Sequence, residues 1–172
     1  MKEAKKIGID ARFFGCRDKG FGRYVENLIK NLENIDKTNQ YFIFLNKNRE
    51  KEYIPQNPNF RKIIISHNFL WPLKIDKKIY DWELDMIHFT CLPFPLFYKT
   101  KNKTVITVHD LIWRISPPFK NLLKKFFYRL SFSNAIKKAN TVIAVSKHTQ
   151  KDILEIYKIN QDKIKVIYEG VN

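Results

Sequence analysis

The sequence predicts an α/β fold in which helices cover both faces of a doubly wound, mostly parallel sheet. Short apolar runs of strand length alternate along the chain with longer segments whose apolar residues recur at helical spacing. The apolar runs also lack a two-residue alternation, as expected for strands that are covered on both faces. With 172 residues the chain is long enough to form a full core. We therefore expect a single Rossmann-like domain over residues 1–172.

The strand-length runs follow one another in order, at 5–14, 41–46, 61–66, 85–90, 103–113, 140–146 and 162–170. The first helix is predicted from apolar residues at helical spacing, which are Val25, Leu28, Ile29, Leu32 and Ile35. A second helix is predicted from about Lys120 to Ala139, after the breaker Pro117-Pro118. A third is predicted over 147–157, with Ser146 as its N-cap.

The composition limits which binding partners and which cellular compartment we expect for the protein. Lys and Arg number 32 against 17 Asp and Glu, a net charge of +15 that attracts polyanions. No helix-turn-helix, RNP-like or zinc-knuckle pattern is present, so only the net charge favours nucleic acid. Cys16 and Cys91 lie far apart, which is typical of neither a disulfide scaffold nor a zinc site. No signal peptide and no apolar stretch of about 20 residues is apparent, and we expect a cytoplasmic protein, peripheral at the inner face of the membrane.

Several polar residues follow predicted strands directly. Ligands of doubly wound folds bind outside the carboxyl ends of the strands. Thr90 ends the run 85–90, His109 and Asp110 follow the apolar part of 103–113, and Ser146 follows that of 140–146. With a glycine-containing loop after the first strand, these residues form a candidate crevice.

That loop, "GCRDKGFGRY", holds three of the five glycines of the chain: Gly15, Gly20 and Gly22. It matches neither Gly-x-Gly-x-x-Gly nor a Walker A loop. One interpretation is a strand-to-helix turn that needs a positive φ. The other is a loop whose backbone N–H groups and following helix N-terminus, next to Arg23, face an anion such as phosphate.

His109 and Asp110 also allow two interpretations. A histidine after an apolar strand can be a packed structural residue. An imidazole at a strand end can instead donate to a ligand hydroxyl, transfer protons or stabilise developing positive charge. Asp110 could orient the imidazole or cap the following turn.

The segment 119–139 has an apolar and a basic face. The apolar face consists of Phe119, Leu122, Leu123, Phe126, Phe127 and Leu130, and the basic face of Lys120, Lys124, Lys125 and Arg129. A helix docked on the sheet with a solvated basic face would have this pattern. A basic amphipathic helix at an anionic membrane surface would have it as well, and the neighbouring stretch 93–103 mixes aromatic residues with lysines.

Taken together, these stretches resemble the N-terminal domain of family-4 glycosyltransferases, which have the GT-B fold. The matching segments are "IGIDAR", "KGFGRYVENLIKNL", "HFTCLPFP", "TVITVHDLIW", "ANTVIAVSKHTQKDI" and "KIKVIYEGVN". Their order agrees over essentially the whole chain. The resemblance is greatest to bacterial mannosyltransferase-like members, in which an isoleucine is usual where this chain has Phe21.

The resemblance implies a retaining transfer from a nucleotide-diphosphate sugar to a glycan or lipid-linked acceptor, as in polysaccharide or lipopolysaccharide biosynthesis, without a metal and with no cofactor. It implies that Gly20 and Gly22, with Gly15, reach the donor's phosphate or sugar. It also implies that His109 lies beside the transferred sugar, with Asp110 as its neighbour. Arg23, Thr90 and Ser146 are further candidates for substrate contacts at the same strand ends.

In the family, "VIYEGVN" leads into a second Rossmann domain that binds most of the donor nucleotide. We therefore expect this chain to be the acceptor-side half, lacking the C-terminal donor-binding domain and inactive until that domain or subunit is supplied. The alternative is a non-catalytic module, derived from such a domain, that binds a membrane surface or another protein.

Overall fold

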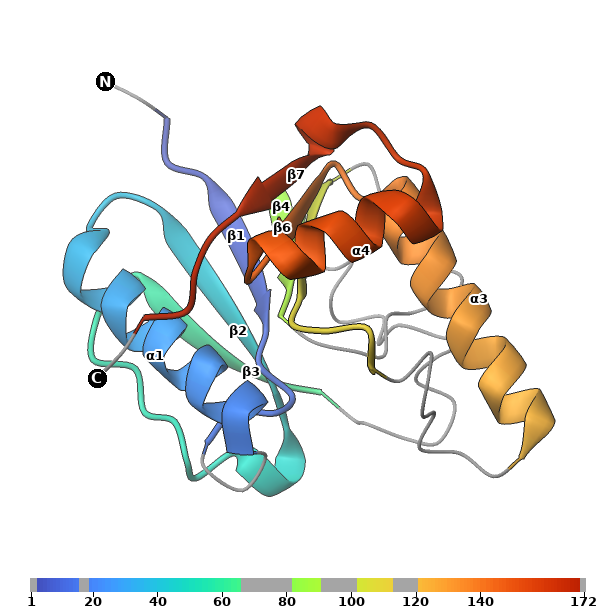
Figure 1. Ribbon diagram of the computed structural model, residues 1–172. Coiled ribbons are helices and arrows are strands. Elements are labelled where there is room, and N and C mark those ends of the chain that lie inside the picture. Colours follow the sequence, from blue (N-terminus) through green and yellow to red (C-terminus); the bar gives the residue numbers. More distant parts are fainter. Residues whose placement is uncertain (1–2, 16–18, 66–81, 91–101, 113–120, 171–172) are drawn as a thin grey trace.

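The computed structural model describes residues 3–15, 19–65, 82–90, 102–112 and 121–170. These residues form a seven-stranded sheet with the order β3-β2-β1-β4-β5-β6-β7, and each pair of neighbours is parallel (Figure 1). The strands are β1 (Lys6–Asp10), β2 (Gln40–Asn46), β3 (Phe60–Ile65), β4 (Met86–Phe89), β5 (Lys103–Val108), β6 (Thr141–Ala144) and β7 (Ile164–Val166). The helices are α1 (Lys19–Ile35), α3 (Leu122–Lys138) and α4 (Lys147–Tyr157), with short 3-10 turns η2 (Lys47–Arg49) and η4 (Gln161–Lys163). The predicted α/β class is confirmed.

The sheet is covered by helices on both faces, which explains why its strands read as continuous apolar runs. Phe42 and Phe44 of β2 join the core beneath α3 and α4, whereas Ile43 between them joins the core beneath α1. Helix α1 contributes Val25 and Ile29 to that second core, and both side chains are fully buried. Figure 1 shows α1 on one side of the sheet and α3 with α4 on the other.

The order of the strands reverses at β1. From β1 the chain moves outward through β2 to β3, and then crosses back so that β4 pairs with the opposite side of β1. In a doubly wound sheet the connections on the two sides of such a reversal diverge, leaving a crevice at the carboxyl ends of the central strands. The carboxyl ends of β1, β4 and β5 therefore mark the place to look for a site.

Three of the predicted runs extend well beyond the ends of the strands they contain. The strands β1, β5 and β7 end at Asp10, Val108 and Val166, while the apolar runs continue beyond them. The chain leaves the sheet at these points. The residues beyond the strand ends, which include Arg12, His109 and Glu169, become loop residues at the carboxyl edge.

Helix α4 begins where its sequence predicts. The Ser146 side chain accepts a hydrogen bond from the Thr149 backbone N–H at 3.0 Å, which satisfies one of the free donors of the first turn. The helix ends at Lys158, which adopts the left-handed conformation with φ 49°.

Helix α3 has apolar residues on more than one side, and the stripe that one of the two interpretations docks on the sheet is exposed. The residues that pack on the core lie in its later turns and include Phe132 and Ile136, both fully buried. The exposed stripe consists of Leu122, Leu123, Phe126, Phe127 and Leu130. Helical spacing places Leu123, Phe127 and Leu130 on the face opposite the docked residues, and Leu122 and Phe126 on the flank between the two faces. Periodicity identifies an apolar face, but it cannot decide which of two apolar faces meets the sheet.

Candidate functional site

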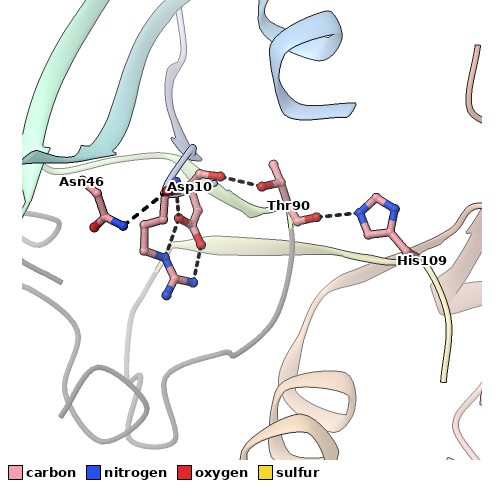
Figure 2. A network of polar contacts seen from close by, with 5 residues as sticks. Asp10, Asn46, Thr90 and His109 are labelled. Carbon is pink, nitrogen blue, oxygen red and sulfur yellow. Dashed lines mark hydrogen bonds and ion pairs between the residues drawn. The ribbon is translucent and has the colours of Figure 1, made fainter. Parts of the chain in front are cut away.

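The candidate site is a polar network that joins the carboxyl ends of β1, β4 and β5 (Figure 2). The Thr90 hydroxyl, directly after β4, donates to the backbone carbonyl of Asp10 at the end of β1. The Thr90 carbonyl faces Nε2 of His109, directly after β5, at 3.0 Å. Thr90 is fully buried. In this geometry it positions His109, and contact between Thr90 and a substrate stays a prediction.

Both ring nitrogens of His109 face oxygen acceptors. Nδ1 lies 2.7 Å from the Oε1 atom of Glu169, and Nε2 lies 3.0 Å from the Thr90 carbonyl oxygen. A carbonyl oxygen and a carboxylate oxygen are both hydrogen-bond acceptors, so the two contacts fix the orientation of the ring. The His109 side chain is 11% exposed, against 46% for Glu169, so the contact between them is open to solvent from the carboxylate side.

Two aromatic side chains of α1 pack edge-on against the His109 ring. The ring centroids of Phe21 and Tyr24 lie 4.9 Å and 4.8 Å from that of His109. The Tyr24 hydroxyl lies 3.1 Å from Oγ1 of Thr107 in β5. Helix α1 is therefore fixed against the strand that carries His109, and the ring has little freedom to rotate.

A second histidine lies beneath this layer. His88 of β4 is wholly buried, with Nε2 2.8 Å from the Thr107 hydroxyl. Burial lowers the pKa of His88 from 6.5 to about 4; the Asp10 carboxylate opposes the shift and His109 adds to it. His88 is consequently neutral at physiological pH. The hydrogen-bonded series of side chains Tyr24, Thr107 and His88 supports the site from within the sheet.

Asp10 and Arg12 form a buried ion pair at the end of β1. The guanidinium donates from Nε to Oδ1 at 2.8 Å and from Nη2 to Oδ2 at 2.7 Å, and both side chains are almost completely inaccessible. Such two-pronged pairing suits the planar guanidinium. Asn46 at the end of β2 donates to the Arg12 carbonyl at 3.3 Å (Figure 2). The pair fixes the turn that leads from β1 toward the glycine loop.

Ser146 reaches the site through the cap of α4. Its hydroxyl lies 2.9 Å from that of Thr149, which in turn donates to the His109 carbonyl at 3.2 Å. Asp110 is exposed, and its Oδ1 accepts from the Ile112 backbone N–H at 3.1 Å, so it caps the turn after His109. The carboxylate that faces His109 is Glu169 rather than Asp110. A role for Asp110 or Ser146 toward substrate stays a prediction.

A cavity of about 340 Å³ adjoins this turn, next to α4. It is lined by Asp110, Leu111, Ile112, His148, Thr149, Asp152 and Ile156. His148 and Asp152 face each other across one turn of α4 at 3.5 Å. The cavity thus combines aliphatic walls with groups that can hydrogen-bond, next to the residue that follows His109.

The structural environment differs among the three glycines of the loop. Gly15 has φ +94°, in the left-handed region. A Cβ atom on Gly22 would lie 1.8 Å from the Gly15 carbonyl oxygen, so the first turn of α1 packs directly on the loop backbone. Gly20 has nothing within 4 Å of such a Cβ and faces open space, and Arg23 is exposed. The positive-φ interpretation therefore fits Gly15, while binding of a phosphate or sugar by any of the three stays a prediction.

Sequence reasoning missed two features of the site. Glu169 is separated from His109 by 60 residues, and no local pattern connects the two. The buried Asp10–Arg12 pair lies in the segment "IGIDAR", where charged residues beside an apolar run could have indicated internal pairing.

Lys120, Cys16 and Cys91 lie outside the described residues, as does the side chain of Lys124. Among the described residues, no three His, Cys, Asp or Glu side chains are grouped so that they could hold a metal ion.

A family model described as "Glycosyltransferase Family 4" matches residues 19–172. The chain belongs to this family. The fold of the family-4 domain is similar to that of a crystal structure of a glycosyltransferase from Rickettsia africae ESF-5, with a TM-score of 0.51 and 19% sequence identity. That match covers 100% of this chain and 44% of the other. The resemblance inferred from the ordered motifs is confirmed.

One curated relative of the family-4 domain is the O-antigen chain mannosyltransferase RfbU of Salmonella typhimurium (strain LT2). The two are 32% identical over 72 residues, which make up 42% of this chain and 20% of RfbU. The chain thus spans less than half the length of either protein to which it is compared.

Proposed function

We propose that this chain is the acceptor-side part of a retaining glycosyltransferase, which moves a hexose such as mannose from a nucleotide-diphosphate sugar to a glycan or lipid-linked acceptor. The observation that carries the proposal is the family match over residues 19–172. The similarity to a mannosyltransferase supports the choice of sugar, and the network at the strand reversal supports the location of the site.

In the proposed reaction the bond between the anomeric carbon and the diphosphate oxygen breaks, and the leaving diphosphate keeps the electron pair. The acceptor hydroxyl oxygen bonds to the same face of that carbon, and its proton passes to the departing diphosphate oxygen. Negative charge grows on the diphosphate, and fixed donors aimed at such charge lower the barrier. The N-terminus of α1, where Gly20 is open to solvent, and the side chain of His109 are the groups of this chain that we assign to that role.

His109 is assigned to charge stabilisation rather than to proton abstraction. Its two nitrogens face the oxygen atoms of Thr90 and Glu169, so neither is directed toward a substrate proton. The acceptor hydroxyl would lie toward the cavity beside Asp110 and Asp152, whose carboxylates can accept hydrogen bonds from sugar hydroxyls. The donor itself is a substrate, and no further cofactor is part of the proposal.

The test is a transfer assay with labelled nucleotide sugars and lipid-linked or free glycan acceptors. The chain is assayed alone and together with a separately supplied C-terminal domain of the family. We expect transfer only in the complemented mixture, and we expect His109→Ala to reduce it about a hundredfold or more. Ile54→Ala is the control, because that side chain is 69% exposed and lies outside both the network and the cavity. Absence of transfer from the complemented mixture, with both parts folded, would leave the non-catalytic module as the better proposal.

A further inference from the structure

Packing holds the plane of the His109 ring but does not decide which way round the ring lies. Phe21 and Tyr24 of α1 contact the ring edge-on, with interplanar angles of 75° and 87°. An imidazole rotated by half a turn about its Cβ–Cγ bond occupies nearly the same space, with each nitrogen exchanged for a carbon. Edge-on aromatic contacts depend on the shape and quadrupole of the rings. They therefore accommodate both orientations of this imidazole.

The two polar contacts of the ring distinguish these orientations. Nδ1 lies 2.7 Å from Oε1 of Glu169, and Nε2 lies 3.0 Å from the Thr90 carbonyl oxygen. After half a turn carbon atoms would face both oxygens, and both contacts would be lost. The Thr90 carbonyl is fixed by the fold, because Thr90 is fully buried and its hydroxyl donates to the Asp10 carbonyl. Glu169 supplies the other contact, from a side chain that can be replaced.

Glu169 reaches His109 because of the path of the chain after β7. The Ile167 N–H donates to the Ala144 carbonyl at 3.0 Å, so the chain is still tied to the end of β6 two residues before Glu169. Strand β6 pairs with β5, which His109 directly follows. Figure 1 shows the segment that follows β7 running toward α1. The carboxylate therefore approaches the ring from an element far from His109 in the sequence.

We propose that Glu169 is a positioning residue that acts through His109. Its carboxylate oxygen holds Nδ1, and this keeps the ring in the one orientation in which Nε2 meets the Thr90 carbonyl. A group that is already oriented needs no rearrangement when charge develops in the transition state. This consequence for transfer rests on the proposed function, in which His109 faces the growing charge, whereas the orientation of the ring does not.

The first experiment observes the ring in the purified chain by nuclear magnetic resonance. The chain has four histidines, and His109→Gln identifies the imidazole signals of His109 by their absence. In the unmodified chain we expect a single set of nuclear Overhauser contacts from the ring protons of His109 to the rings of Phe21 and Tyr24. Glu169→Ala removes one of the two contacts that select the orientation. A second set, from the rotated ring, should then appear beside the first.

Glu169→Gln tests whether an acceptor oxygen is what the ring requires. The amide keeps one carbonyl oxygen, so this variant should retain the single set of contacts. Glu155→Gln is the matched charge control, because Glu155 is 62% exposed and pairs with Lys151 at 3.8 Å, away from the site. It should leave the His109 signals unchanged. Glu169 is 46% exposed, and a contact so open to solvent contributes little to stability. Circular dichroism verifies that each variant is folded.

The second readout is transfer by the chain together with a separately supplied C-terminal domain. Glu169→Ala should lower kcat by about tenfold with KM nearly unchanged, because a misplaced ring weakens charge stabilisation in the transition state and not the binding of substrate. Glu169→Gln should stay within about threefold of the unmodified chain.

The proposal is overturned if Glu169→Ala keeps the single set of ring contacts, or if Glu169→Gln loses that set as fully as Glu169→Ala does. In an active mixture it is also overturned if Glu169→Ala transfers as fast as the unmodified chain. A mixture in which even the unmodified chain is inactive counts against the proposed function alone, because the ring contacts are measured without any sugar transfer.

Discussion

The buried histidine of β4 predicts a specific loss of stability in acid. His88 is wholly buried against Thr107, and burial lowers its pKa from 6.5 to about 4. In the unfolded chain the same imidazole binds a proton below about 6.5. Between these two values the unfolded state therefore binds more protons than the folded state does, and the free energy of unfolding falls as the pH is lowered.

The pKa difference between 6.5 and about 4 lowers the free energy of unfolding by roughly 3 kcal/mol, at about 1.4 kcal/mol for each tenfold change in proton affinity. The contribution is absent above the unfolded value, where both states are neutral, and reaches its full size near pH 4. A loss of this size is a large fraction of the stability of a typical domain.

Urea unfolding at about pH 7.5 and about pH 4.5 measures the loss. His88→Gln keeps an amide that can hydrogen-bond to Thr107 but cannot titrate, so its stability should fall by about 2 kcal/mol less than that of the unmodified chain. His148→Gln, at an 84% exposed position, should behave like the unmodified chain. Equal losses for the unmodified chain and His88→Gln would refute the reasoning, because other groups would then cause the acid sensitivity.

Two further predictions concern the start of the chain, both measured by urea unfolding. Gly22→Ala should destabilise the fold by about 2 kcal/mol or more, because the added Cβ would overlap a backbone oxygen. Gly20→Ala should be neutral or stabilise the fold by up to about 1 kcal/mol, because that position faces open space within a helix. Equal effects of the two substitutions would contradict the assigned packing. Arg12→Met should cost about 3–5 kcal/mol by leaving the Asp10 carboxylate buried without its partner, and adding Asp10→Leu should recover much of that loss. A single-variant cost below about 1 kcal/mol would show that the pair is not structurally important.

The strands and the N-cap could be predicted because their causes are local. The run "YFIFLN" is apolar at consecutive positions since alternate residues enter different cores, and β2 indeed covers it. Ser146 caps α4 through a bond to a residue three positions later. Strand ends were less predictable, because where the run 162–170 leaves the sheet depends on how far β6 continues beside β7.

The site could be predicted only as far as parallel topology extends. Thr90 and His109 were expected at one edge because carboxyl ends of parallel strands meet there, and the structure brings them into contact. The pairing of His109 with Glu169 depends on the path of the chain after β7, which no spacing rule describes. The orientation of α3 stayed open for a related reason, since apolar residues on two sides compete for one sheet and only the packed fold decides between them.

The central place of β1 has a consequence for synthesis. Among the strands described, β1 leaves the ribosome before the others, yet one of its two neighbours, β4, begins only at Met86. Until that residue has been made, β1 can pair only with β2, and its other side is an unpaired edge of an apolar strand. At about 5–20 residues per second the delay lasts some seconds. During that time β1, which is central in the finished sheet, is an edge strand. The β4 strand of a neighbouring nascent chain could then pair with β1 in place of the β4 strand of the same chain.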